Sequence, residues 1–173
     1  VGFTHELERA YDQALQSYQR AGIVGPDGRG PLEGLAAGLD AIAPDADAAL
    51  AIGCDTPLVE PAVVRLLMDR LATREASVAV AAGQRQPLLA VYRTCIASRV
   101  HRLLAEGRQS LMALLDACDA VETSEEMLRG VDPPLHSLLN CNTPNAYRLA
   151  LETAGYNTPG GATSGEHTGR GDA

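Results

Sequence analysis

Two short stretches of this chain place oxygen-bearing side chains beside a Thr-Pro pair. The first, "GCDTP" at 53–57, puts Asp55 directly after an apolar run. A carboxylate at the end of a buried strand can hold Mg²⁺ through oxygen and leave coordination positions for phosphate and water. The same carboxylate can instead cap the Thr-Pro turn by accepting hydrogen bonds from backbone N–H groups. From this stretch alone, the two interpretations stand equally.

The second stretch, "NCNTP" at 140–144, carries two amide side chains, Asn140 and Asn142. Residues two apart in an extended segment point to the same side, so these amides are expected to share a face. They can bind a polar substrate or orient a metal; alternatively, Asn142 serves only the start of the following helix. Because the layout of strand end, Thr-Pro and helix occurs twice, we predict one shared ligand-binding edge rather than two separate turns.

A glycine-rich stretch, "DGRGPLEG" at 27–34, surrounds a predicted helix start. Free backbone N–H groups at a helix N-terminus can meet an anionic ligand. A loop followed by a helix that begins with proline is the commoner cause of this pattern. A further polar group at 84–86, "QRQ", is predicted to lie in a turn, where it can contact an anionic substrate or simply join two strands.

Composition restricts the class of protein. The formal net charge is −8, hydrophobic residues make up 46% and aromatic residues 3% of the 173 residues, and all basic residues are Arg. An acidic chain without a basic stripe argues against nucleic-acid binding, and no apolar run is long enough to span a membrane. The four cysteines have no metal-site spacing, which predicts reduced, mostly buried thiols in a cytoplasmic protein.

Predicted strands alternate with predicted amphipathic helices along the chain. The strands are expected at 48–53, 76–82, 87–93, 120–123 and 138–140, and the helices at 4–21, 31–43, 61–74, 94–106, 109–117 and 144–154. This alternation indicates an α/β fold, three-layered and Rossmann-like, with a mostly parallel sheet and helices on both faces. Ligands of such sheets bind beyond the carboxyl ends of the strands, and Asp55 is predicted to lie at one of these ends.

Four motifs, taken in order, carry a resemblance to a known family: "GPLEG", "GCDTP", "QPLLAVYR" and "NCNTP". Over about residues 1–154 the chain resembles the molybdenum cofactor guanylyltransferases, which are nucleotidyltransferases with a Rossmann-like fold. The resemblance implies transfer of GMP from GTP to the terminal phosphate of molybdopterin, with Mg²⁺ as cofactor and release of pyrophosphate. It also implies GTP, molybdopterin or the molybdenum cofactor, and molybdoenzyme maturation factors as partners.

The resemblance assigns roles to five residues of this chain. The metal-binding aspartate of the family matches Asp55, which is thereby implied to be catalytic and to contact the nucleotide. The acidic residue that the family places before "GPL" matches Asp27, and Gly30 belongs to the same nucleotide-binding loop. The asparagines of the family's "NxNTP" match Asn140 and Asn142, on the pterin and metal side of the cleft.

One part of the family's pattern is not found in this sequence. The family begins with a strand and a Gly-rich loop of the type LAGGxSxRMG, followed by a Lys, which cradles the nucleotide and neutralises phosphate charge. Phosphoryl-type transfer depends on positioning and charge neutralisation. We therefore expect a partial nucleotidyltransferase domain at 1–155, without the first strand and the Gly-rich loop, little activity of the chain alone, and a disordered tail at 156–173.

Two other functions remain open at this point. The chain is alternatively a nucleotidyltransferase that uses CTP or a different phosphorylated acceptor. Relatives that make the cytosine form tend to carry a "DQP"-like segment where this chain has "CDTP", which favours GTP. The second alternative is a non-catalytic module that binds the pterin cofactor.

Overall fold

A four-stranded sheet forms the centre of the molecule. The computed structural model describes residues 30–156, so the predicted helix at 4–21, Asp27 and the predicted tail from 157 onward lie outside the described residues. The strands are arranged in the order β1-β3-β2-β4. Their bounds are Ala48–Ile52 for β1, Ala76–Ala81 for β2, Gln84–Arg93 for β3 and Ala120–Thr123 for β4.

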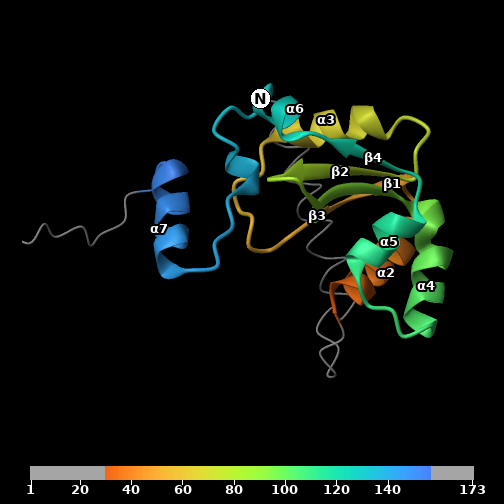
Figure 1. The fold of residues 1–173 in the computed structure, drawn as a ribbon. Coiled ribbons are helices and arrows are strands. Elements are labelled where there is room, and N and C mark those ends of the chain that lie inside the picture. Colours follow the sequence, from red (N-terminus) through yellow and green to blue (C-terminus); the bar gives the residue numbers. More distant parts are fainter. Residues whose placement is uncertain (1–29, 157–173) are drawn as a thin grey trace, which may run out of the picture.

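Helices cover both faces of this sheet (Figure 1). On one face lie α2 (Pro31–Ile42), α4 (Ala97–Ala105) and α5 (Leu111–Ala117). On the other lie α3 (Pro61–Leu71) and α6 (Glu125–Arg129). The α/β, three-layer, Rossmann-like fold class is therefore confirmed. None of the helices within residues 30–156 combines the length and the apolar character that crossing a membrane requires.

The direction of the strands follows the prediction with one exception. Strands β1, β2 and β4 run the same way, because β1 and β2 are each antiparallel to β3 and β4 is parallel to β2. The exception, β3, lies between β1 and β2. Its direction is set by a two-residue hairpin turn in which Ala82 and Gly83 have φ of 49° and 74°, since a crossover to a parallel strand needs far more chain. The predicted turn at 84–86 was wrong, because these residues already belong to β3.

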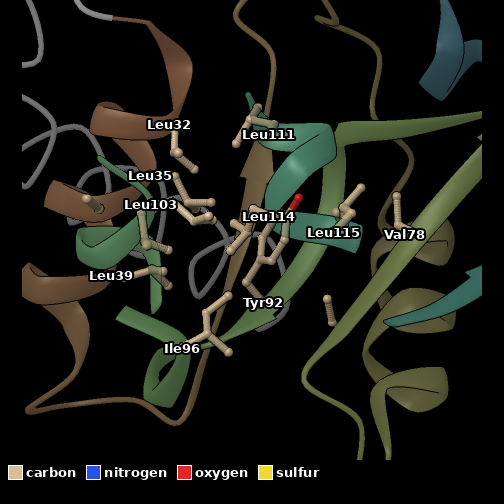
Figure 2. Packing of buried hydrophobic residues seen from close by; sticks show 14 residues of the cluster. Leu32, Leu35, Leu39, Val78, Tyr92, Ile96, Leu103, Leu111, Leu114 and Leu115 are labelled. Atoms are coloured by element: carbon tan, nitrogen blue, oxygen red, sulfur yellow. The ribbon is translucent and has the colours of Figure 1, made fainter. Parts of the chain in front are cut away.

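The larger core cluster lies on the α2, α4 and α5 face and is built from aliphatic side chains, as the low aromatic content requires. Tyr92 of β3 is fully buried there among leucines of these helices (Figure 2). Its hydroxyl donates a hydrogen bond of 2.9 Å to the carbonyl of Pro87 in the same strand. Burial raises the pKa of Tyr92, so the phenol remains protonated and keeps this bond.

The helix boundaries follow proline and hydroxyl residues. Pro31, Pro61 and Pro144 occupy first-turn positions of α2, α3 and α7 (Pro144–Thr153), where a missing N–H costs nothing. The predicted helix at 94–106 begins instead with a 3₁₀ turn, η1 (Thr94–Ile96). Thr94 does not cap it, because its hydroxyl donates to the carbonyl of Ala46 at 3.0 Å.

The predicted strand at 138–140 was wrong. The chain forms a 3₁₀ turn there, η2 (His136–Leu138), which follows Leu135 in a left-handed conformation with φ of 56°. The carboxylate of Asp132 accepts hydrogen bonds from the backbone N–H groups of His136 and Ser137. The N–H groups of Leu138 and Leu139 then donate to the carbonyls of Leu135 and His136, both at 3.0 Å, and are not free to pair with a strand.

The four cysteines are free of disulfides, as expected for reduced thiols. The prediction that most are buried was wrong: Cys54 and Cys95 are exposed, and Cys118 and Cys141 are half-buried. Cys54 and Cys95 follow the ends of β1 and β3.

Candidate functional site

A hollow of about 170 Å³ lies beyond the carboxyl end of β1. Three segments surround it: the loop after β1, the first half of β3 and the stretch before α7. The lining offers carboxylate, amide and hydroxyl oxygens over an apolar floor, and residues 30–156 contribute no basic side chain to it. It comprises Gly53, Asp55, Thr56, Gln86, Pro87, Leu88, Leu89, Ser137, Leu138 and Asn140.

An irregularity in β3 builds one wall of the hollow. Val78 pairs with Ala90 but the next residue of β2, Ala79, pairs with Gln86, so residues 87–89 of β3 bulge out of this ladder. Pro87 has no N–H to donate to β2, which explains why the ladder breaks at this position. On its other edge the bulged segment still pairs with the chain after β1, because the Leu88 carbonyl accepts a hydrogen bond of 2.9 Å from the N–H of Gly53. The "QPLL" part of the sequence motif thus shapes the site.

The loop after β1 is closed by Thr56 and not by Asp55. The backbone N–H and the hydroxyl of Thr56 both donate to the Gly53 carbonyl, at 3.1 and 2.7 Å. Within residues 30–156 the Asp55 carboxylate forms no hydrogen bond or ion pair, so the bonds expected from a turn-capping aspartate are not made. The carboxylate of this half-buried residue is available to a ligand.

Glycine is required at position 53 for the carboxylate to lie where it does. A Cβ atom built on Gly53 would come within 2.4 Å of Oδ1 of Asp55, well inside van der Waals contact. Gly53 itself is buried between β3 and the loop. A side chain at this position would therefore force the Asp55 carboxylate into another rotamer.

The two Thr-Pro stretches lie side by side, as the repeated layout predicted. The N–H of Cys141 donates a hydrogen bond of 2.7 Å to the backbone carbonyl of Asp55, and Asn140 lines the same hollow as Asp55. Asn142 is exposed and does not line the hollow. It does not cap α7 either. The cap is the Thr143 hydroxyl, which accepts a hydrogen bond of 3.1 Å from the N–H of Ala146.

The remaining predicted residues are distributed differently. Asp27 lies outside the described residues, and Gly30 is the N-cap of α2 and does not line the hollow. In the "QRQ" group, Gln86 lines the hollow, whereas the guanidinium of Arg85 contacts Asp116. The roles assigned to Asp27, Gly30, Asp55, Asn140 and Asn142 all stay predictions.

Sequence reasoning missed two buried polar residues beside the hollow, Asp132 and Ser137, which are 2% and 1% exposed. The available signal was weak, because an aspartate before Pro133 and Pro134 is typical of an ordinary turn. Asp132 bonds to the nearby N–H groups of residues 136 and 137, and only Ser137 bonds to a distant residue, Glu60.

The donor atoms around the hollow fit a hard metal ion that arrives with a phosphorylated ligand. The side-chain oxygens that can bind a ligand come from the carboxylate of Asp55, the amides of Gln86 and Asn140 and the hydroxyl of Thr56, whereas the Ser137 hydroxyl accepts from the N–H of Glu60. Mg²⁺ is commonly held by one or two carboxylates together with substrate phosphates, whereas structural zinc requires sulfur or imidazole. Within the described range, no three His, Cys, Asp or Glu residues form a metal-binding group. Substrate phosphates can complete the coordination of a metal held at Asp55.

Comparison with known proteins gives matches to one family. The family model of the MobA-like NTP transferase domain matches residues 7–123. The probable molybdenum cofactor guanylyltransferase of Chloroflexus aggregans is 34% identical over 125 residues, which cover 70% of this chain and 59% of that protein. The protein of the same name from Bacillus mycoides is 30% identical over 121 residues, or 69% of this chain and 58% of that protein.

A solved structure agrees as well. The crystal structure of molybdopterin-guanine dinucleotide biosynthesis protein A from Archaeoglobus fulgidus superimposes with a TM-score of 0.62 at 26% identity, covering 73% of this chain and 63% of that one. This chain spans about three fifths of the length of the curated relatives just described. Because the family model and the relatives match the chain over most of its length, it belongs to the family of MobA-like NTP transferase domains.

Proposed function

We propose that this chain forms the metal side and the acceptor side of a nucleotidyl-transfer site, which joins GMP from GTP to the terminal phosphate of molybdopterin. The observation that carries the proposal is the pairing of Asp55, whose carboxylate has no partner in residues 30–156, with Asn140 across one hollow. The two lie at the carboxyl end of β1 and are tied by the bond from Cys141 to Asp55. This is the edge where α/β sheets bind their ligands.

The choice of substrates rests on the relatives. The proteins from Chloroflexus and Bacillus are named for guanylyl transfer to the molybdenum cofactor, and the Archaeoglobus protein for molybdopterin-guanine dinucleotide synthesis. We extend these names to this chain, with GTP as the nucleotide, Mg²⁺ as the cofactor and the cytoplasm as the location. We treat residues 1–155 as one nucleotidyltransferase domain.

The reaction requires positioning more than proton transfer. An oxygen of the pterin phosphate attacks the α-phosphorus of GTP, a new P–O bond forms, and the bond to the β-phosphate breaks to release pyrophosphate. The second pKa of a phosphate monoester is about 6, so the attacking oxygen is ionised near neutral pH and needs no general base. This agrees with the part of the lining that residues 30–156 supply, in which there is no histidine.

Three residues of the hollow have a part in this proposal. Asp55 holds the divalent metal, which when bound neutralises negative charge that develops on the phosphates. The amides of Asn140 and Gln86 donate hydrogen bonds that orient the acceptor phosphate or the pterin. Asp27 and Gly30 are assigned to the nucleotide and Asn142 to the pterin side, as the family resemblance implies.

The test is direct product analysis. The protein is incubated with Mg²⁺, molybdopterin and GTP labelled at the α-phosphate, and the labelled pterin dinucleotide and pyrophosphate are measured together. We expect slow labelling of the dinucleotide, in keeping with the little activity expected of the chain alone, together with equimolar pyrophosphate and loss of both when EDTA is added. Equal labelling from CTP would show that the transfer does not discriminate between GTP and CTP.

A non-catalytic pterin-binding module gives a different result in the same experiment. It would bind molybdopterin in a calorimetric titration yet release no pyrophosphate from either nucleotide. Absence of both binding and product from a folded sample would refute the proposed function.

A further inference from the structure

The segment at 132–141, called here the strap, connects α6 to the start of α7 and supplies the wall of the hollow that faces Asp55. It begins with Asp132, which is 2% exposed. Its Oδ1 accepts from the N–H of His136 at 3.0 Å and its Oδ2 from the N–H of Ser137 at 2.8 Å. Both carboxylate oxygens thus shape the strap itself.

Two long-range hydrogen bonds attach the strap to the β1–α3 connection. The Ser137 hydroxyl accepts 2.9 Å from the N–H of Glu60, 77 residues earlier in the chain, at the N-cap of α3. Four residues further on, the N–H of Cys141 donates to the carbonyl of Asp55 at 2.7 Å. Asn140 is held between these two attachments.

We infer that Asp132 and Ser137 are positioning residues that fix Asn140 opposite Asp55. This inference rests on the proposed function for its kinetic consequence, but not for its structural one. Asp132 sets the conformation of residues 136 and 137, Ser137 fixes that turn to the start of α3, and the register so defined brings Cys141 to Asp55. Neither residue touches the reacting atoms.

Hydrophobic contacts keep the strap attached without deciding its register. Leu135 and Leu138 pack against the core on the α3 and α6 face, and such contacts tolerate sliding because they have no preferred direction. Hydrogen bonds are directional, and a buried N–H that loses its acceptor costs about 1–3 kcal/mol. Loss of the Ser137 hydroxyl is therefore expected to loosen the strap at Asn140 rather than to unfold the domain.

The test compares Ser137→Ala with Ser110→Ala. Ser110 caps α5 through the N–H of Ala113, on the opposite face of the sheet from the strap. Ser110→Ala therefore also removes one serine hydroxyl that accepts a backbone hydrogen bond. In Ser137→Ala we expect the amide proton of Cys141 to exchange on the order of tenfold faster than in wild type, as loss of one hydrogen bond predicts. In Ser110→Ala it should exchange at the wild-type rate.

The kinetic part uses the same two variants. For Ser137→Ala we expect the KM for molybdopterin to rise on the order of tenfold while the KM for GTP changes less than about twofold, because only the acceptor side is displaced. Ser110→Ala should change neither KM. Asp132→Asn removes one of the two acceptor oxygens and should fall between wild type and Ser137→Ala in both measurements.

The outcomes separate the strap from the reaction. Wild-type exchange at Cys141 in both Ser137→Ala and Asp132→Asn would overturn the inference, as would equal rises in the two KM values. If the wild-type protein makes no dinucleotide, the proposed function fails. The exchange comparison still decides whether Ser137 and Asp132 fix the strap.

Discussion

Two carboxylates at opposite ends of the sheet, those of Glu75 and Asp55, differ in the hydrogen bonds that they accept. At the amino end of β2, the carboxylate of Glu75 accepts two hydrogen bonds from the Arg99 guanidinium, at 2.5 and 2.9 Å, and one of 2.8 Å from the N–H of Asp119. At the carboxyl end, Asp55 lines an open hollow, and its carboxylate has no such partner in the described part of the chain.

Other charged side chains at the amino end of the sheet also form hydrogen bonds or ion pairs within the protein. The Arg93 guanidinium donates to the backbone carbonyls of Arg74, at 2.9 Å, and Ala72. Arg74 forms an ion pair of 2.6 Å with Asp119. These groups join the starts of β2 and β4 to the end of β3.

The difference separates residues that serve folding from residues that serve binding. A carboxylate already bonded to a guanidinium and a backbone N–H has little capacity left for a ligand. A carboxylate whose neighbouring turn is closed by other groups keeps that capacity. The Arg99 hydrogen bond first, and the Asp119 N–H next, hold the pKa of Glu75 below its ordinary value, which records how fully this end is satisfied.

The largest expected effect is at the open end, in Asp55→Asn. We expect GMP transfer to fall by about 10²–10³-fold, the usual cost of removing one electrostatic contact to the transition state. The free energy of unfolding should change by less than about 0.5 kcal/mol, because no internal bond is lost within the described residues. Product assays and urea unfolding measure the two quantities.

The control for this prediction is Asp69→Asn, an exposed carboxylate on α3. It should leave transfer and stability at wild-type values. Transfer within about twofold of wild type in Asp55→Asn would remove the metal role from this residue, since such electrostatic contacts are worth far more.

The next largest effect is expected at the amino end of the sheet, in Arg99→Ala, where stability rather than transfer should fall. The Arg99 and Glu75 side chains are 27% and 29% exposed, so solvent screens part of their interaction. We expect a loss of about 1–2 kcal/mol in the free energy of unfolding, with unchanged transfer per folded molecule. Arg102→Ala, an exposed arginine on the same helix, should cost much less. A fall in the specific activity of Arg99→Ala alone would contradict the division between the two ends.

A smaller effect is expected from Gly53→Ala. The new methyl group would displace the Asp55 carboxylate, since the Cβ would lie 2.4 Å from Oδ1. We expect transfer to fall by about tenfold through this misplacement. Gly38→Ala, inside α2 with nothing within 4 Å of its Cβ, should instead stabilise the fold by about 0.5–1 kcal/mol and leave transfer unchanged. Equal transfer in the two variants would show that Gly53 does not set the carboxylate position.

The smallest effect is the contribution of Glu75 to acid stability. Because folding lowers its pKa below the ordinary value of 4.5, its stabilising contribution is complete above that pH and is lost as the pH falls through the native pKa. Glu75→Gln should therefore flatten the decline in the free energy of unfolding on the acid side of this window. Urea titrations across the window, with the exposed Glu126→Gln as control, would detect the change. A parallel decline in both variants would refute it.

Much of the fold could be predicted because its signals are local. Alternating apolar strands and amphipathic helices indicated a covered α/β sheet, and Pro61 and Pro144 marked helix starts. The short helix α6 was missed, although Ser124 as N-cap and acidic residues in the first turn are a usable signal. Five residues are too few for a helical period to be evident.

The direction of β3 and the nature of the strap were not readable in the same way. The strap depends on which acceptors bind its backbone N–H groups, and the direction of β3 depends on the conformation of the turn before it. Strand 138–140 looked apolar enough to pair, but Asp132 captures the N–H groups that precede it. The hairpin at Ala82 and Gly83 likewise requires positive φ at alanine, a conformation that sequence propensity disfavours.

By itself the sequence determined the layering of the fold, the place of Asp55 at a strand end and the likeness of the two Thr-Pro stretches, because each is a property of neighbouring residues. Only the tertiary structure decided that Thr56 closes the turn, that the bulge at Pro87 opens a hollow, and that Cys141 bonds to Asp55. The physical reason is that a hydrogen bond between residues 86 positions apart leaves no local pattern. It exists only after the sheet and its helices have brought both segments together.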